Sequence, residues 1–293
     1  MISILIPVYN FNIVELISEI SYQAEKSGHH FEILCYDDAS DEGFKKQNRS
    51  IASLKNIRYV ELYSNIGRSK IRNKLAADAL YESLLFIDGD TKIVSSEFLL
   101  KYLKFCDKKA VVTGGICYEK YPPKEKEKFF RWFYGCKREA IPAISRQKFP
   151  YQSFMTSNFL IPKSVFLSVK FNEEIMGYGH EDTLFGYALF KNKIPIVHIE
   201  NPLYHIGIEK TDVFIKKTEE GLKNLLFIYH KNLVGKEIKL LKYYKKLNKF
   251  WIRPLIKILY KFFKKFILSN LNSKNPKLIL FDLYKLGYLI SLK

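Results

Sequence analysis

The sequence lacks the features of a secreted, disulfide-rich or membrane-spanning protein. Its four cysteines form no Cys-x-x-Cys pair and no zinc-binding pattern with histidine, which indicates a reducing compartment. No uninterrupted apolar segment is long enough to cross a bilayer. The first residues have neither the basic start nor the cleavage site of a signal peptide, so we expect a cytoplasmic protein.

Acidic residues are scarce in the last quarter of the chain. Residues 216–293 have 19 basic and 4 acidic side chains, which accounts for +15 of the net charge of +18. A lysine-rich composition alone does not explain this asymmetry. A basic segment of this kind favours an anionic surface, either phospholipid or nucleic acid.

Residues 236–271 combine this charge with an apolar stripe at helical spacing, formed by Trp251, Leu255, Ile258, Leu259, Phe262, Phe263 and Phe266. The lysines expected to flank the stripe are Lys257, Lys261, Lys264 and Lys265. This pattern is typical of a helix that lies on an anionic membrane surface, with residues 277–292 alongside. The alternative is a helix packed on the rest of the protein, with its lysines extended to solvent.

The first hundred residues alternate between strand and helix patterns. Short apolar segments predict strands at residues 3–8, 31–36, 57–62 and 84–87. Helices are predicted at residues 12–25 and 68–80, the second with Ile71, Leu75, Ala79 and Leu80 facing inward. The alternation predicts an α/β fold with a doubly wound, mostly parallel sheet, which binds ligands at the carboxyl ends of its strands.

The pattern after residue 100 is less regular. Strands are expected at residues 110–116, 157–161 and 194–199, a loop at 120–128 and a short helix at 181–191. From residue 211 onward helices are expected to dominate.

Polar clusters follow three of the predicted strands, namely Asn10, Asp37-Asp38 and Asp88-Gly89-Asp90. Two carboxylates on either side of a glycine can both face a ligand just beyond a strand end. Their oxygens suit Mg²⁺ or Mn²⁺, which would neutralise charge on a diphosphate leaving group. The alternative is an ordinary surface turn, because Asp-Gly-Asp is a common turn sequence.

Four other positions each have more than one interpretation. Asp37 and Asp38 could bind a nucleobase N–H or cap the turn. Arg72, one turn after Arg68, could bind phosphate near a helix N-terminus or lie on a solvated face.

The acidic pair Glu181-Asp182, which follows a glycine-rich loop, could include a general base or interact with its helix dipole. His205 could complete a metal site, contact a diphosphate or be structural.

Together these residues resemble the family 2 glycosyltransferases, which have the GT-A fold, over about residues 1–210. The matching segments, in chain order, are residues 3–10, 37–41, 65–67 with 71–73, 86–90, 157–158 with 162–163, 179–182, and His205. The resemblance implies a catalytic domain at 1–215, with a nucleotide-binding half at 1–100 and an acceptor-binding half at 101–215. Residues 216–293 would then form a basic amphipathic helical extension.

The resemblance also implies a nucleotide-sugar donor, with a UDP-sugar as the first choice, and Mn²⁺ or Mg²⁺ as cofactor. The residues expected at the donor are Pro7, Tyr9, Asn10, Asp37, Asp38, Asn65, Gly67, Arg72, Asp88, Gly89, Asp90 and Asn158. Asp90 would hold the metal most directly, with Asp88 and His205 as further ligands. Asp182 would be the base of a single inverting displacement, and Glu181 would orient the acceptor.

Four positions depart from the family pattern: Ala39 and Ser157 replace glycine, Ile71 replaces alanine, and His180 precedes the Glu-Asp pair. They leave the sugar and the acceptor open. We expect transfer to a hydroxyl of a glycan or lipid-linked acceptor in cell-surface polysaccharide synthesis. The enzyme would be peripheral on the inner face of the plasma membrane.

Two other functional classes share some of these features. A nucleotidyltransferase acting on sugar phosphates also combines a sheet with acidic metal ligands, but the sequence has no glycine-rich phosphate loop with lysine near its start. A non-enzymatic protein could use the basic segment to bind nucleic acid or membrane. No nucleic-acid-binding module is recognisable, so we expect no nucleic-acid partner.

Overall fold

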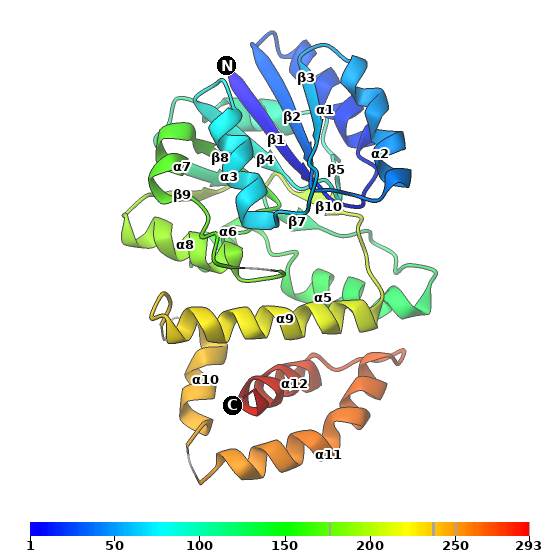
Figure 1. Ribbon diagram of the computed structural model, residues 1–293, viewed down its shortest axis with the longest axis vertical. Coiled ribbons are helices and arrows are strands. Elements are labelled where there is room, and N and C mark those ends of the chain that lie inside the picture. Colours follow the sequence, from blue (N-terminus) through cyan, green and yellow to red (C-terminus); the bar gives the residue numbers. More distant parts are fainter. Residues whose placement is uncertain (176, 236–237, 250, 293) are drawn as a thin grey trace. The chain divides into compact units, whose positions relative to one another are not determined.

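The computed structural model describes residues 1–175, 177–235, 238–249 and 251–292 (Figure 1). The chain forms two compact units. Unit 1 comprises residues 1–119, 138–174 and 181–207, and unit 2 comprises residues 120–137, 175–180 and 208–293. The functional division at residue 215 stays a prediction.

Unit 1 is built on a seven-stranded sheet in the order β3-β2-β1-β4-β8-β6-β9. Its strands are β1 (Ile2–Val8), β2 (Phe31–Asp37), β3 (Ile57–Glu61), β4 (Ser83–Ile87), β6 (Val111–Thr113), β8 (Asn158–Pro162) and β9 (Ile196–His198). The first four run parallel, and β8 is antiparallel to both of its neighbours. The predicted mostly parallel α/β fold is confirmed.

Helices cover both faces of this sheet. On one face the core includes residues of α1 (Val14–Lys26) and α4 (Phe98–Leu103), and on the other it includes residues of α3 (Arg68–Asp78), α7 (Lys163–Val169) and α8 (Glu181–Lys191). Alternate side chains of a strand point to opposite faces. Ile4 and Ile6 of β1 therefore join the first cluster and Leu5 the second, which explains the continuous apolar sequence of this central strand.

Two details of unit 1 differ from the sequence prediction. Leu80 is 75% exposed instead of facing inward, because α3 ends at Asp78 and Ala79 is extended. The N–H of Leu80 then donates to Glu32 at 2.5 Å, and the helical period no longer directs its side chain.

The strand predicted at residues 110–116 is also interrupted. Gly114 and Gly115 separate β6 from β7 (Ile116–Cys117), which joins β5 (Thr91–Lys92) and β10 (Leu203–His205) in a second, three-stranded sheet. The remaining short helices of unit 1 are α2 (Glu42–Asn48), η1 (Arg49–Ser53) and α6 (Ala143–Arg146).

Unit 2 is helical in its described part, as expected after residue 211. It contains η2 (Lys126–Lys128), α5 (Phe129–Arg138, of which Arg138 belongs to unit 1), α9 (Thr211–His230), α10 (Lys239–Leu247), α11 (Arg253–Leu271) and α12 (Leu278–Ser291). Side chains from α5, α9, α11 and α12 share one core, formed by Phe130, Phe214, Ile215, Ile267, Leu271, Phe281 and Tyr284. In Figure 1, α12 lies between α9 and α11. Within the described ranges, no helix is both long and apolar enough to cross a membrane.

The Gly114 position has no room for a side chain, and this generates a first prediction. A Cβ there would overlap the Asn201 carbonyl and lie 2.5 Å from the Tyr102 hydroxyl. We expect Gly114→Ala to destabilise the protein by about 1–3 kcal/mol in denaturant unfolding followed by circular dichroism.

Gly43 is the matched control. It lies in α2, and its Cβ would meet no atom within 4 Å. Gly43→Ala should be neutral or stabilising by up to about 1 kcal/mol, because alanine is the better helix former. Equal effects of the two substitutions would contradict the packing argument.

Candidate functional site

The expected polar residues lie at one edge of the sheet of unit 1. The parallel register pairs Val8 with Asp37 and Leu5 with Phe86, so the chain leaves β1, β2 and β4 on the same side. Gly89 is closely enclosed here, because a Cβ would lie 3.2 Å from the Pro7 carbonyl and 3.1 Å from an Ile13 methyl group. The structure therefore brings the ends of these three strands together.

Asp38 fastens the loop that enters α3. Its two carboxylate oxygens accept the backbone N–H groups of Ile66 at 2.7 Å and Gly67 at 3.0 Å. Asn65 donates its side-chain amide to the Asp38 carbonyl at 3.1 Å. Gly67 has a φ of +85°, which suits glycine at this N-cap. Burial raises the pKa of Asp38, and the two N–H groups oppose that shift.

Asp37 forms its hydrogen bonds with other groups of the protein. It is fully buried, and its oxygens accept the Ser40 N–H at 2.7 Å and the Tyr59 hydroxyl at 3.1 Å. Asn10 closes the same turn, since its N–H donates to the Ser40 hydroxyl and its amide oxygen accepts the Asp41 N–H. These contacts give Asp37 and Asn10 a positioning role. Asp38 has one too, since it is 5% exposed and both of its oxygens accept backbone N–H groups, so Tyr9 is the open side chain at this edge.

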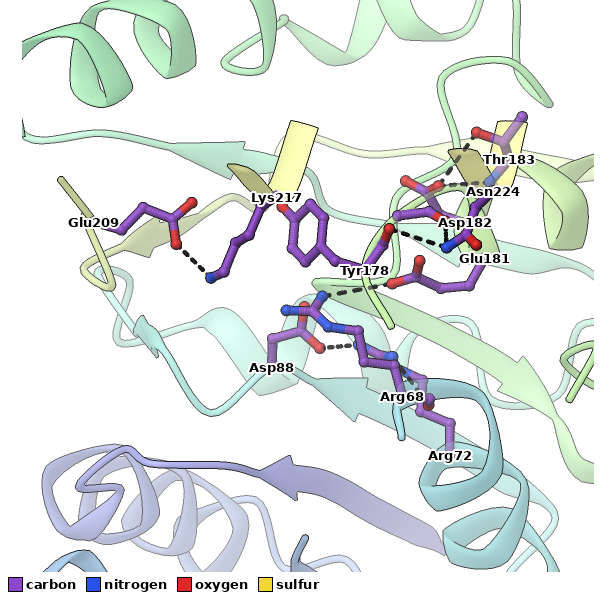
Figure 2. Close-up of polar contacts among 11 residues, drawn as sticks. Arg68, Arg72, Asp88, Tyr178, Glu181, Asp182, Thr183, Glu209, Lys217 and Asn224 are labelled. Atoms are coloured by element: carbon purple, nitrogen blue, oxygen red, sulfur yellow. Dashed lines mark hydrogen bonds and ion pairs between the residues drawn. The ribbon is translucent and has the colours of Figure 1, made fainter. Parts of the chain in front are cut away.

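Arg72 and Asp88, whose side chain is 20% exposed, form an ion pair between α3 and the end of β4 (Figure 2). Arg72 Nη2 lies 2.5 Å from Asp88 Oδ1, and its Nη1 donates to the Arg68 carbonyl at 3.2 Å. The Arg72 side chain is 2% exposed, and its Nε has no hydrogen-bond partner among the described residues. Burial raises the pKa of Asp88, whereas the Arg72 guanidinium lowers it.

Asp90 is the more open acid of the Asp-Gly-Asp motif. Its side chain is 40% exposed, and its Oδ2 lies 3.9 Å from His205 Nδ1. The backbone N–H of Ile206 donates to the Asp90 carbonyl at 3.0 Å, which holds the two segments together. The carboxylate oxygen fits Mn²⁺ or Mg²⁺, and the imidazole nitrogen beside it favours the transition metal Mn²⁺ of the two. Within the described ranges, no three His, Cys, Asp or Glu side chains cluster as a complete metal site.

Two residues near Asp90 were not singled out from the sequence. A Cβ on Gly207 would lie 2.8 Å from the Asp90 Cβ, so only glycine lets the chain pass here. The ring of Tyr118 lies 5.7 Å from the His205 ring and restricts its position. The glycine two residues after the histidine is a signal for such a close approach, whereas nothing in the sequence marks Tyr118.

Asn158 lies at the start of β8 and is fully buried. Its amide oxygen accepts the Tyr102 hydroxyl, and its amide N–H groups donate to the carbonyls of Gly115 at 3.1 Å and Asn201 at 2.8 Å. Asn158 was expected to contact the nucleotide-sugar donor, but its side chain instead connects Tyr102, Gly115 and Asn201 within the protein. The adjacent Ser157 accepts the Asp88 N–H through its carbonyl at 3.0 Å.

Glu181 and Asp182 occupy the first turn of α8. Arg68 Nη1 lies 3.5 Å from Glu181 Oε1, and Asp182 Oδ1 accepts the Thr183 N–H at 2.6 Å (Figure 2). Burial and then the neighbouring Glu181 charge raise the pKa of Asp182 to about 6. A carboxylate with this pKa is a suitable general base near neutral pH.

The glycine-rich loop at residues 177–180 belongs to unit 2, where α9 holds it. Asn224 donates to the carbonyl oxygens of Tyr178 at 3.1 Å and Gly179 at 3.3 Å. Lys217 lies over the Tyr178 ring at 5.2 Å and pairs with Glu209 (Figure 2). Gly179 has a φ of +94°, a conformation that glycine adopts without strain.

The sheet architecture and the cluster of acids at one strand edge define an α/β protein whose ligand site is expected at the carboxyl ends of its strands. The profile of glycosyl transferase family 2 matches residues 3–169, so the chain belongs to that family. This confirms the family resemblance stated from the sequence motifs. No curated protein sequence matches the chain.

Solved structures share the fold. TarS residues 1–349 from S. aureus, in complex with UDP, has a TM-score of 0.50 and 19% identity over 77% of this chain and 65% of that one. Mannosyltransferase PcManGT from Pyrobaculum calidifontis, in complex with GDP-Man and Mn²⁺, has a TM-score of 0.53 and 14% identity over 78% of this chain and 64% of that one. The chain therefore spans less than two thirds of the length of these two proteins.

The ion pair of Arg72 and Asp88 generates a second prediction. Arg72→Met removes the cation and leaves Asp88 in place, which should cost about 2 kcal/mol or more at neutral pH. Because protonation neutralises the uncompensated Asp88, the loss should diminish as the pH falls. Arg72→Met/Asp88→Asn removes both charges and should recover part of the loss. Denaturant unfolding of the full double-mutant cycle measures these effects, and additive losses would contradict coupling between the two residues.

Proposed function

We propose that the chain transfers a sugar from a nucleotide-diphosphate donor, with a UDP-sugar as the first choice, to an acceptor hydroxyl with inversion. The observation that carries this proposal is the pair of unequal acids after β4 in a member of glycosyl transferase family 2. Asp88 is held by Arg72, whereas Asp90 is open beside His205. The UDP complex of TarS and the GDP-Man complex of PcManGT support a nucleotide donor. Because their nucleobases differ, a donor panel decides between uracil and guanine.

Asp90 and His205 would hold a divalent metal, with Asp88 further from it because Arg72 occupies Oδ1. Mg²⁺ and similar ions are commonly held by one or two protein groups together with substrate phosphates and water, so two protein ligands suffice. When bound, the metal would neutralise charge on the departing nucleoside diphosphate. The Mn²⁺ in the PcManGT complex is consistent with this chemistry.

The nucleotide would lie against the loop that Asp38 fastens. The Asp38 contacts with Ile66 and Gly67 hold the entry to α3. The amino end of α3 favours an anionic group, and Arg68 adds a cation there. Asp38 would contact the base through its remaining acceptor capacity.

Asp182 would take the proton from the acceptor hydroxyl as that oxygen attacks the anomeric carbon. One displacement with one base inverts that carbon and requires no covalent intermediate. Glu181, paired with Arg68, would orient the acceptor. Residues 1–215 would form the catalytic domain.

The acceptor would be a glycan or lipid-linked glycan in cell-surface polysaccharide synthesis, used at the inner face of the plasma membrane. The charge of residues 216–293 supports this location, because these residues contribute +15 to the net charge. A basic extension of this kind would keep the enzyme near anionic lipid, where such an acceptor is found.

The third prediction concerns the metal. Purified protein with Mn²⁺ and a panel of nucleotide sugars should release nucleoside diphosphate, and a chelator should stop the release reversibly. Asp90→Asn should lower the rate about 100-fold or more, because metal stabilisation is worth several kcal/mol. It should also weaken Mn²⁺ binding in the presence of the nucleoside diphosphate, measured by electron paramagnetic resonance. The proposed function would be contradicted if the protein neither released nucleoside diphosphate from any donor nor bound any donor.

The exposed Asp107 provides the matched acid-to-amide control for this experiment. Asp107→Asn should keep both the Mn²⁺ affinity and the rate. Equal losses in Asp90→Asn and Asp107→Asn would mean that Asp90 does not hold the metal.

The fourth prediction concerns the base. Because only the ionised carboxylate accepts a proton, kcat should rise with pH through about 6 and then level off. Asp182→Asn should lower kcat roughly 10²- to 10⁴-fold and remove this pH dependence, while donor affinity stays unchanged. Loss of donor affinity in parallel with kcat would assign Asp182 to donor binding instead.

A further inference from the structure

The outer face of α11 exposes large apolar side chains in a continuous stripe. Trp251, just before the helix, is 74% exposed and Phe262 is 78% exposed. Leu255, Ile258 and Phe266 complete a row at spacings of three and four residues, which places them on one helix face. Leu259 and Phe263, also exposed, widen the row.

The opposite side of α11 already has its packing partners. Ile267 and Leu271 are buried in the core of unit 2 with Tyr284 of α12. Gly287 of α12 approaches Tyr260 so closely that a Cβ would lie 2.5 Å from that ring. The exposed stripe is therefore not required for the helix to pack, and it remains available for an external partner.

The charge around the stripe has a single sign. Residues 238–281 contain twelve Lys and Arg side chains and no Asp or Glu. Lys261 and Lys265 are exposed and border the stripe, three residues after Ile258 and three after Phe262. On α10, four exposed lysines accompany the exposed Tyr243, namely Lys239, Lys242, Lys245 and Lys246.

The structure narrows the set of flanking lysines expected from the sequence. Lys264 Nζ lies 3.6 Å from Glu219 and 5.8 Å from the rings of Tyr260 and Tyr284, so its charge already has a partner within unit 2, although its side chain is 41% exposed. Lys261 and Lys265 are thus the clearest border cations on α11. Lys236, Glu237 and Phe250 of the predicted segment lie outside the described residues.

We propose that the outer face of α11, together with Trp251 and the lysines of α10, docks on an anionic phospholipid surface. The apolar stripe would enter the headgroup region, and the lysines would meet the lipid phosphates. Aromatic side chains and lysines side by side suit this interface, because the rings favour the apolar region and the lysines favour the anionic headgroups.

Two other partners fit the same surface less well. A second copy of the chain would bring two strongly basic surfaces together, which opposes association. Nucleic acid would neutralise the lysines, but the aliphatic members of the stripe have no stacking or hydrogen-bonding partner there. Anionic lipid satisfies both the charge and the apolar surface.

The fifth prediction uses flotation of the full chain with vesicles. Vesicles of phosphatidylcholine and phosphatidylglycerol in equal parts should bind the protein, and phosphatidylcholine alone should bind it at least about tenfold more weakly. Phe262→Ser/Phe266→Ser and Lys261→Glu/Lys265→Glu should each lower the affinity for mixed vesicles at least about tenfold. Added salt should weaken binding of the wild type.

Matched variants on unit 1 control for general loss of exposed groups. Phe149→Ser/Phe190→Ser removes two exposed aromatic rings, and Lys104→Glu/Lys109→Glu reverses two exposed lysines. Both should bind mixed vesicles like the wild type. Mixed vesicles should also shift the fluorescence of Trp251 to shorter wavelength, and this shift should be absent in Trp251→Phe.

Three outcomes would overturn the proposal. The first is equal recovery with both vesicle types or with all variants. The second combines two results: Phe262→Ser/Phe266→Ser keeps the wild-type affinity for mixed vesicles, and duplex DNA releases the protein from those vesicles. Together they would assign the lysines to nucleic acid. The third is a change from dimer to monomer in sedimentation of that variant without loss of vesicle binding. Nucleoside diphosphate release from soluble donor should persist in the surface variants, so vesicle binding and transfer are tested separately.

Discussion

The ion pair between Arg72 and Asp88 determines how the two acids after β4 can be used. It places a buried guanidinium within 2.5 Å of the first acid, so that acid is already neutralised by the protein. Asp90, two residues later, has its side chain 40% exposed and lies beside His205. A symmetric pair of free carboxylates would repel each other at this spacing, whereas the pairing of Asp88 leaves one net charge for a cation. The inequality of the two acids thus follows from one arginine on α3.

Contacts made by residues 66–72 hold the first turns of α3 in place. Asp38 holds its entry through the Ile66 and Gly67 N–H groups, and Arg72 fixes its second turn to the end of β4. Arg68, one turn earlier, reaches Glu181 at the start of α8. Two arginines four residues apart therefore connect the helix to the acids after β4 and to the acids of α8. Under the proposed function these are the leaving-group side and the base side of one displacement, so a shift of α3 would disturb both.

Much of the sheet could be predicted from the sequence, because buried parallel strands have continuous apolar segments and end in polar turns. The bounds of α8 were predicted to the residue, and β2 and β3 within one residue. The interruption at Gly114-Gly115 was missed, since a pair of glycines in an apolar segment does not show that Arg146 and Asn158 occupy the space beside it. Leu80 was placed inward because periodicity contains no signal for the Glu32 contact that ends the helix.

The roles of the polar residues were harder to predict than their positions. Asp37 and Asp38 are adjacent in sequence, yet one is enclosed by Ser40 and Tyr59 and the other by Ile66 and Gly67. Those partners lie up to 29 residues away along the chain, so local pattern cannot separate the two acids. Long-range contacts also distinguish the lysines of α11, where Lys264 pairs with Glu219 of α9 and its exposed neighbour Lys265 has no ion pair among the described residues. One residue along a helix is a rotation of about 100°, which is enough to turn a side chain away from a partner on a neighbouring helix. Composition can therefore identify a basic amphipathic helix, but the contacts of α11 with α9 and α12 decide which of its charges are available to a partner.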